Sequence, residues 1–127
     1  MVRASTGVER LDRMSSNALT RGAVVTVAEP GPYSGKPRPA VVVQANRWLQ
    51  GHPSVTLCPF TSTLLEAPLI RLPMTPTQAN GLLKPSQLMV DKLFTVPIQA
   101  IGSRIGTLEA SAMAELDLAL RSWLELP

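Results

Sequence analysis

An arginine between two prolines opens a run of β-branched residues, and this stretch constrains the fold more than any other. Pro37 and Pro39 each fix φ near about −65° and push the preceding residue towards extended geometry. Arg38 therefore has an extended backbone at the entrance to the Ala-Val-Val-Val run at 40–43. A continuous run of this kind is typical of a strand buried on both faces. The stretch predicts a core strand with a guanidinium at its start.

Short apolar runs separated by prolines, glycines and polar turns predict a mainly β protein. The 12 prolines among 127 residues suit short strands and tight connections better than helices. The strands are expected at 23–28, 39–46, 55–60, 69–72, 88–96 and 104–108. Only 110–126 has helical periodicity, carried by Met113, Leu116, Leu120, Trp123 and Leu124. We expect a small, strongly bent β-barrel or sandwich closed by one C-terminal helix.

The chain is expected to form one domain, because 127 residues allow a single modest core. Residues 1–20 lack periodicity and are expected to form a flexible tail before a domain at 21–127. No apolar run approaches the roughly 20 residues needed to span a bilayer, and the single cysteine, Cys58, fits a reducing compartment. We therefore expect a cytoplasmic protein without a membrane segment. The net charge of +3 is compatible with a polyanionic partner.

Several kinds of active site are excluded by residue counts and spacings. One histidine, His52, cannot form a two-histidine acid–base pair, and with one cysteine it leaves no zinc site. The spacing from Gly31 to Gly35-Lys36 is one residue short of a phosphate-binding loop, and a proline follows the lysine where a hydroxyl is needed. No Gly-x-Ser-x-Gly occurs and the carboxylates are dispersed. We expect neither a metal nor another cofactor.

Polar side chains are expected at the ends of the predicted strands. Arg38 precedes the second strand, Thr61 and Ser62 follow the third, and Asp91-Lys92 lies within the fifth. Each alone has an ordinary structural role, since hydroxyls after strands make turns and adjacent opposite charges form solvated pairs. Together they could bind a phosphodiester through a guanidinium, hydroxyl donors and a carboxylate that orients or accepts a proton.

A set of motifs resembles, in order, the signatures of the MazF/PemK family of toxin ribonucleases. The resemblance covers about residues 20–125 and rests on Arg21-Gly22-Ala23-Val24-Val25, Arg38-Pro39-Ala40-Val41-Val42-Val43, Cys58-Pro59-Phe60-Thr61-Ser62-Thr63, Gly81-Leu82-Leu83-Lys84-Pro85-Ser86, Val90-Asp91, and 101–108 before the final helix. It implies a small SH3-like β-barrel of about five to seven short strands with a C-terminal α-helix. It also implies a homodimer, a cognate antitoxin that blocks the RNA groove, and metal-independent, sequence-selective cleavage of single-stranded mRNA that inhibits translation and growth.

The resemblance also assigns roles to individual residues. Arg38 matches the family's catalytic arginine, Thr61 its catalytic threonine, and Asp91 the aspartate that some members use as a base. RNA contacts are expected from Lys36, Ser62 and Lys92, and from Tyr33 in the loop at 29–37.

The chain departs from the family's pattern at three places. Met89 stands where some members carry a second arginine used as the acid, and Lys92 replaces the usual glutamine. Leu64-Leu65-Glu66 lacks the lysine that some members have after the threonine. Arg38 therefore carries more of the inferred mechanism.

The implied reaction needs no metal, because the 2′-hydroxyl of RNA attacks the adjacent phosphorus and leaves a 2′,3′-cyclic phosphate and a 5′-hydroxyl. Arg38 would stabilise charge on the phosphorane oxygens, with help from Thr61. Arginine is a poor general base, since its pKa exceeds about 12, so the base is open between Asp91 and water. Two alternatives remain: a sister toxin on the same barrel that poisons DNA gyrase without cleaving RNA, and an inert barrel that serves as a binding module.

Overall fold

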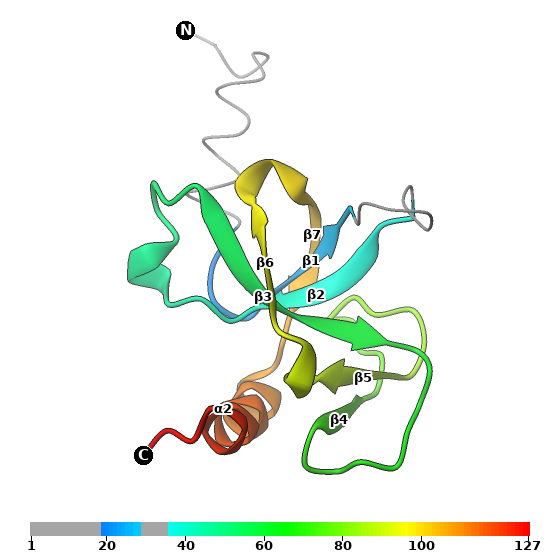
Figure 1. Ribbon diagram of the computed structural model, residues 1–127. Coiled ribbons are helices and arrows are strands. Elements are labelled where there is room, and N and C mark those ends of the chain that lie inside the picture. Colours follow the sequence, from blue (N-terminus) through cyan, green and yellow to red (C-terminus); the bar gives the residue numbers. More distant parts are fainter. Residues whose placement is uncertain (1–18, 29–35) are drawn as a thin grey trace, which may run out of the picture.

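The computed structural model describes residues 19–28 and 36–127, which fold into a bent antiparallel sheet with one long helix (Figure 1). The seven strands are joined in the order β4-β5-β3-β2-β1-β7, and β6 also pairs with β3. Their bounds are β1 Ala23–Val27, β2 Arg38–Val42, β3 Ser54–Thr61, β4 Arg71–Met74, β5 Ser86–Met89, β6 Phe94–Pro97 and β7 Ile101–Thr107. The helix α2 spans Ala110–Leu124, and the 3-10 turns η2, η3 and η4 span Asn46–Trp48, Val90–Lys92 and Ile98–Ala100.

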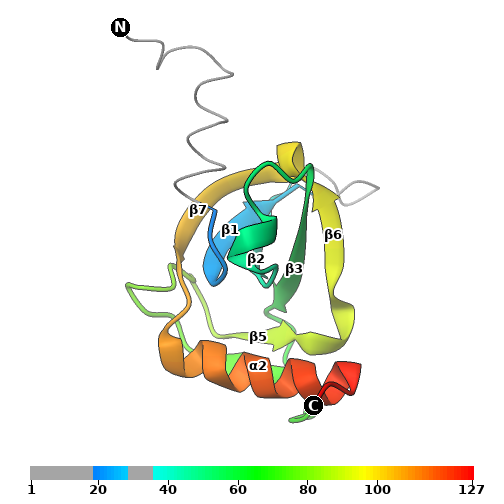
Figure 2. The same ribbon diagram turned by 90° about the vertical axis from the view of Figure 1, so that its left-hand side faces the viewer.

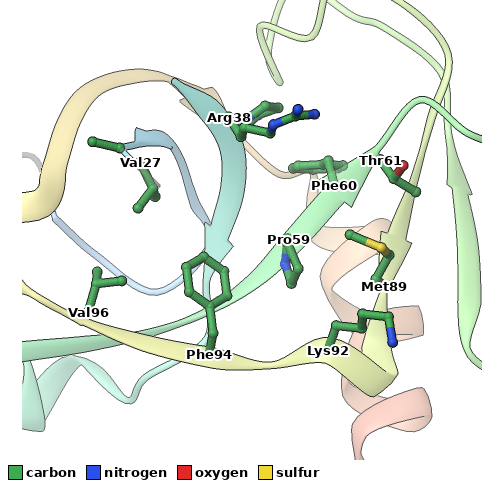
Figure 3. A pocket seen from close by; sticks show the side chains of 11 residues that line it. Val27, Arg38, Pro59, Phe60, Thr61, Met89, Lys92, Phe94 and Val96 are labelled. Atoms are coloured by element: carbon green, nitrogen blue, oxygen red, sulfur yellow. The ribbon is translucent and has the colours of Figure 1, made fainter. Parts of the chain in front are cut away.

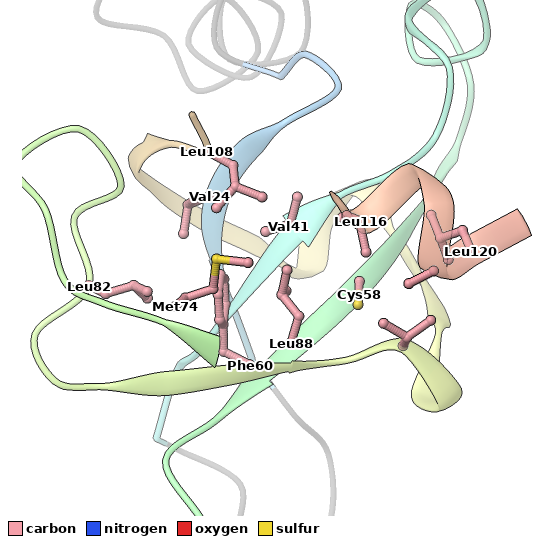
Figure 4. Packing of buried hydrophobic residues seen from close by; sticks show 12 residues of the cluster. Val24, Val41, Cys58, Phe60, Met74, Leu82, Leu88, Leu108, Leu116 and Leu120 are labelled. Atoms are coloured by element: carbon pink, nitrogen blue, oxygen red, sulfur yellow. The ribbon is translucent and has the colours of Figure 1, made fainter. Parts of the chain in front are cut away.

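Strands β2 and β3 lie at the centre of the sheet with both faces covered. Val41 and Cys58 belong to a cluster that includes Leu116 and Leu120 of α2, as Figure 4 shows. Their neighbours along the strands belong to a second cluster on the other face, because successive side chains of a strand point to opposite faces. The members of that second cluster on these two strands are Ala40, Val42, Val55 and Leu57. The predicted core strand is confirmed.

Strand β3 changes its partners along its length, and this bends the sheet. Its first half pairs with β6, from Ser54↔Pro97 to Leu57↔Phe94, and its last residues pair with β5. Figure 2 shows the strands curving around an interior while α2 lies along the side of β5. The predicted fold class, a mainly β, small SH3-like barrel with a C-terminal helix, is confirmed.

The predicted strand at 88–96 is wrong, because η3 divides it into β5 and β6. Val90 is fully buried, and its backbone N–H donates to the Ile70 carbonyl at 3.0 Å. The Asp91 carboxylate accepts a hydrogen bond from the guanidinium of Arg71. These contacts draw the chain out of the extended path, so Asp91 and Lys92 lie in a turn and not in a strand.

Three other predicted strands differ from the observed ones by two residues or more at an end, and one of them, predicted at 104–108, is observed as β7 at Ile101–Thr107. Strand β2 ends at Val42 and not at Asn46, and the side-chain oxygen of Gln44 accepts a hydrogen bond from the Thr56 backbone N–H at 2.8 Å. A side chain thus takes a place in the ladder that a backbone carbonyl would otherwise fill. The strand predicted at 69–72 begins at Arg71 and continues to Met74.

The apolar stripe of α2 is only partly covered. Leu116 and Leu120 are buried, whereas Trp123 and Leu124 are 49% and 48% exposed. Asp117 accepts a hydrogen bond from the guanidinium of Arg21 at 2.8 Å, which joins the helix to the segment before β1. None of the helices in the described ranges is long and apolar enough to cross a membrane.

Two predictions concern residues at the edge of the described ranges or beyond them. Leu19, which was expected in the tail, is buried against the second cluster. Residues 1–18 of the expected tail, and residues 29–35 of the predicted loop with Tyr33, lie outside the described residues.

Candidate functional site

Arg38 and Thr61 lie where β2 begins and β3 ends. The two strands pair through Val42↔Leu57, Val41↔Cys58 and Ala40↔Pro59. This antiparallel register, continued by two residues, brings Arg38 opposite Thr61 on one face. The β2–β3 ladder stops before that point, at Ala40↔Pro59, while Thr61 pairs with Gln87 of β5 on the opposite edge of β3. Pro39 and Pro59 have no N–H to continue it.

The separation of the two strands opens two hollows that share a ridge. We name them the Phe94 hollow, about 460 Å³, and the Lys84 hollow, about 510 Å³. Figure 3 shows the Arg38 side chain extending above Phe60, with Thr61 on the far side of that ring. The residues that line both hollows, and so form the ridge, are Arg38, Pro39, Phe60 and Thr61.

The lining of both hollows is positively charged. Lys92 lines the Phe94 hollow, Lys36 and Lys84 line the Lys84 hollow, and Arg38 lines both. Among the described residues that line these two hollows there is no aspartate or glutamate. Cations gathered without carboxylates attract polyanions.

The hydroxyl of Thr61 is oriented by a turn. The side chain is half-buried, and its oxygen accepts a hydrogen bond from the Thr63 backbone N–H at 3.1 Å. The hydroxyl proton can then be donated to a ligand on the ridge. Ser62, exposed between the two threonines, lines the Lys84 hollow. The expected grouping of Arg38, Thr61 and Ser62 is therefore present.

Asp91 lines neither hollow. Its carboxylate is bonded to the guanidinium of Arg71, a residue of β4 that is 8% exposed. Desolvation acts to raise the pKa of the Asp91 carboxyl, but the hydrogen bond and charge of Arg71, together with the Lys92 ammonium, hold this pKa below its usual range. The Asp91 carboxylate is thus kept ionised and bonded to Arg71. Lys92, the next residue, does line the Phe94 hollow.

The remaining reactive side chains lie apart from the ridge. Cys58 is fully buried, and burial, with the nearby Asp91 charge, raises the pKa of its thiol to about 12. His52 is exposed in the turn before β3. Within residues 19–28 and 36–127, no group of three or more His, Cys, Asp or Glu side chains could hold a metal ion.

The sequence did not predict a site role for Lys84. The segment after β4 places this lysine at the Lys84 hollow. The buried Asn80 side chain organises this segment by accepting hydrogen bonds from the N–H groups of Thr77 and Leu82 at 3.0 and 2.9 Å. Gly81 has a φ of +70°, and a Cβ there would lie 2.0 Å from the Ile105 carbonyl oxygen. The signal was present, because a glycine that starts a short Lys-Pro turn marks a constrained loop.

Phe94 and Arg71 were also missed as contributors. Phe94 gives the Phe94 hollow an aromatic wall, and only the break between β5 and β6 turns it towards the ridge. Arg71 stands in a short apolar stretch, and no local pattern indicates that its partner is Asp91, 20 residues further along the chain.

A bent sheet with a cationic ridge between two hollows is typical of a small protein that binds an anionic chain. Comparisons with known proteins identify its family. The family model described as PemK-like, MazF-like toxin of type II toxin-antitoxin system matches residues 20–124. The chain is 42% identical over 106 residues to the probable endoribonuclease MazF of Mycolicibacterium smegmatis, which covers 84% of this chain and 96% of the relative. The chain therefore belongs to the PemK/MazF family of type II toxins, as the sequence motifs predicted.

Solved structures share the same fold. The Mycobacterium tuberculosis toxin MazF-mt6 matches with a TM-score of 0.70 at 25% identity, covering 83% of this chain and 98% of that one. A MazE-MazF structure from Deinococcus radiodurans matches with a TM-score of 0.72 at 19% identity, covering 86% and 98%. At such low identity the second match speaks for the fold alone.

Proposed function

We propose that this chain is a toxin endoribonuclease that cleaves single-stranded RNA, in particular mRNA, at short specific sequences. The observation that carries the proposal is the ridge, where Arg38 and Thr61 stand between two hollows whose described lining residues include cations and no carboxylate. The family and the similarity to the probable endoribonuclease MazF of M. smegmatis support the same activity. Cleavage of mRNA would inhibit translation and growth in the cytoplasm until an antitoxin neutralises the toxin.

The ridge suits a scissile phosphodiester, with one flanking nucleotide in each hollow. The Arg38 guanidinium presents a fixed fork of donors to the non-bridging oxygens. These oxygens gain charge as the 2′-hydroxyl attacks the phosphorus, so the contact strengthens in the transition state. Thr61 donates its hydroxyl to the same oxygens. The products are a 2′,3′-cyclic phosphate and a 5′-hydroxyl, whose leaving oxygen receives a proton from Arg38 or from water.

The proposed reaction does not use a metal ion. The chemical reason is that the described lining, with four cations and no carboxylate, repels Mg²⁺ and offers it no carboxylate ligand. In such a site the guanidinium supplies the charge stabilisation that a metal supplies elsewhere. Further contacts to the RNA are proposed for Lys36, Ser62 and Lys92, and for Tyr33 outside the described residues.

The experiment uses long transcripts in excess EDTA, with the cut sites mapped and a short RNA then made around one of them. We expect cleavage with 2′,3′-cyclic phosphate and 5′-hydroxyl ends, and none when the scissile nucleotide lacks its 2′-hydroxyl. A requirement for Mg²⁺, or cleavage of the deoxy substrate, would contradict the mechanism. Growth inhibition without RNA cleavage, unchanged in Arg38→Ala, would favour the gyrase alternative.

A homodimer and a cognate antitoxin are proposed as partners. Similar solved structures include a mycobacterial endoribonuclease in complex with its cognate antitoxin and a MazE-MazF structure from Deinococcus radiodurans. The half-covered stripe of α2, with Trp123 and Leu124 about half exposed, offers apolar surface for a second copy. Light scattering at micromolar concentration should give twice the monomer mass, and a monomer would count against the dimer.

A further inference from the structure

The buried cation Arg71 has its carboxylate partner in Asp91. One guanidinium nitrogen bonds the carboxylate and also lies 3.5 Å from the Ile70 carbonyl oxygen. The Nε atom of Arg71 is buried and has no hydrogen-bond partner among the described residues. A buried cation requires compensation, and removal of its partner leaves an unpaired charge. The pair therefore fixes the Asp91 side chain in one place.

The other carboxylate oxygen of Asp91 faces Lys92. The Asp91 Oδ2 atom lies 3.6 Å from the Lys92 ammonium nitrogen. The Lys92 side chain is 58% exposed and lines the Phe94 hollow, as Figure 3 shows. One carboxylate thus joins a buried cation to an exposed cation at the candidate site.

Contacts with the rest of the protein also fix the backbone of η3. Val90 is fully buried, its N–H bonds the Ile70 carbonyl, and α2 packs against the turn. Met89, just before η3, and Lys92, the last residue of η3, both line the Phe94 hollow. Asp91 does not line it. Asp91 is therefore placed to act on the hollow through its neighbour.

We propose that Asp91 is a positioning residue: anchored by Arg71, it holds the Lys92 ammonium in the Phe94 hollow, where Lys92 binds a phosphate of the RNA next to the scissile one. This proposal rests on the proposed ribonuclease function. It gives Asp91 a role other than that of general base, so water or the substrate itself must take the 2′-hydroxyl proton. It also accounts for a lysine at position 92 in place of the usual glutamine, because an ammonium can be held by an ion pair with this carboxylate.

The proposal and its alternatives predict effects of different sign when Asp91→Asn is tested for RNA affinity. Asp91→Asn removes a negative charge near the site, so if Asp91 is a bystander, RNA binding strengthens. If Asp91 positions Lys92, binding weakens, because the freed ammonium must be ordered again for each phosphate contact. If Asp91 is the general base, binding does not weaken and the cleavage rate falls by about 10²–10⁴-fold.

The experiment is a double-mutant cycle between Asp91→Asn and Lys92→Gln. Affinity is measured on a short RNA spanning a mapped cut site, with the scissile 2′-hydroxyl replaced by hydrogen, and rate by single turnover at saturating RNA. We expect Asp91→Asn to weaken binding by about two- to fivefold when Lys92 is present, and not in the Lys92→Gln background. Lys92→Gln should reduce the slope of log affinity against log salt by about 0.7. The saturating rate should stay within about tenfold of wild type.

Asp117→Asn is the matched control, since it removes the same charge from another Arg–Asp pair, with Arg21, that lines neither hollow. It should not weaken binding. If Asp91→Asn strengthens binding, weakens it equally in both backgrounds, or abolishes cleavage at unchanged affinity, the proposal is overturned. If Asp91→Asn does not fold, the Arg71→Met/Asp91→Asn double variant removes both buried charges and replaces it in the cycle.

A measurement without RNA separates this proposal from the proposed function. Lysine amines are labelled by reductive ¹³C-methylation, and the Lys92 signal is assigned by its loss in Lys92→Gln. Asp91→Asn should shift the Lys92 signal in the free protein, whereas Asp117→Asn should not. If wild-type protein neither binds nor cleaves RNA, the proposed function fails and this shift still tests the Asp91–Lys92 contact. No shift would contradict the positioning role.

Discussion

Arg38 and Thr61 occupy opposing positions on two strands that part between them. The β2–β3 register would pair them, but the ladder ends at Ala40↔Pro59, so their side chains border a ridge between two hollows and not a closed ladder. On the opposite edge of β3, Thr61 pairs with Gln87 of β5. The site thus lies where the pairing of β2 with β3 ends.

The Arg71–Asp91 pair should matter for stability at neutral pH. Asp91→Asn leaves a buried guanidinium without its counter-charge, and we expect a loss of about 3 kcal/mol in the free energy of unfolding measured with urea. The Arg71→Met/Asp91→Asn variant should regain most of this loss. A double variant as unstable as the single one would show that packing and not charge sets the cost.

The stabilising effect of Asp91 should depend on pH in one direction. Its folded-state pKa lies below the usual value of about 3.9, so its contribution is fully present above the unfolded-state pKa and is lost as pH falls through the folded-state pKa. The difference in unfolding free energy between wild type and Asp91→Asn should therefore be constant from about pH 8 to 5 and shrink below about pH 4. A difference that grows on acidification would contradict the lowered pKa.

The Asn80 network should control the Lys84 hollow from a distance. Asn80→Ala removes a side chain that makes hydrogen bonds to Thr75, Thr77 and Leu82. We expect a loss of about 2 kcal/mol in unfolding free energy, and weaker RNA binding because Lys84 loses its fixed loop. Asn46→Ala, which removes an exposed amide bonded to the Arg21 backbone N–H, is the control and should leave RNA affinity unchanged.

Cys58 should be inert in the folded protein. With its pKa raised to about 12 by burial, only about one thiol in 10⁴ is ionised at pH 8, and the thiolate is the reactive form. Ellman's reagent should react slowly at pH 8 and rapidly after addition of denaturant. Fast reaction in native conditions would show that the core around Cys58 opens.

The parts of the fold that sequence could predict are those that local patterns encode. The β-branched run after Pro39 predicts a strand, and its covered faces follow from the lack of polar alternation; Leu116 and Leu120 follow from helical spacing. The ridge was predictable as strand ends, since Arg38 stands between two prolines and Thr61 is followed by the polar residues Ser62 and Thr63. The family motifs then supplied the order of these pieces.

Long-range pairings could not be predicted in the same way. Nothing near Asp91 indicates that Arg71 will bond it, and this bond, with burial of Val90, is what breaks the expected strand at 88–96. The role of Lys92 depends on that break, because in a continuous strand its side chain would follow the alternation of the sheet. Likewise, nothing near Asp117 indicates that it accepts a hydrogen bond from Arg21, 96 residues earlier in the chain.

The central claim is that Arg38 stabilises charge that develops only in the transition state, and Arg38→Ala tests it most directly. Single-turnover cleavage at saturating RNA should fall by about 10²–10³-fold, while affinity for the deoxy-substituted RNA changes by less than about fivefold. Arg38→Lys should recover only part of the rate, because an ammonium lacks the planar fork. If Arg38→Ala instead weakens binding and leaves the rate at saturating RNA unchanged, Arg38 only anchors a phosphate and the account is wrong.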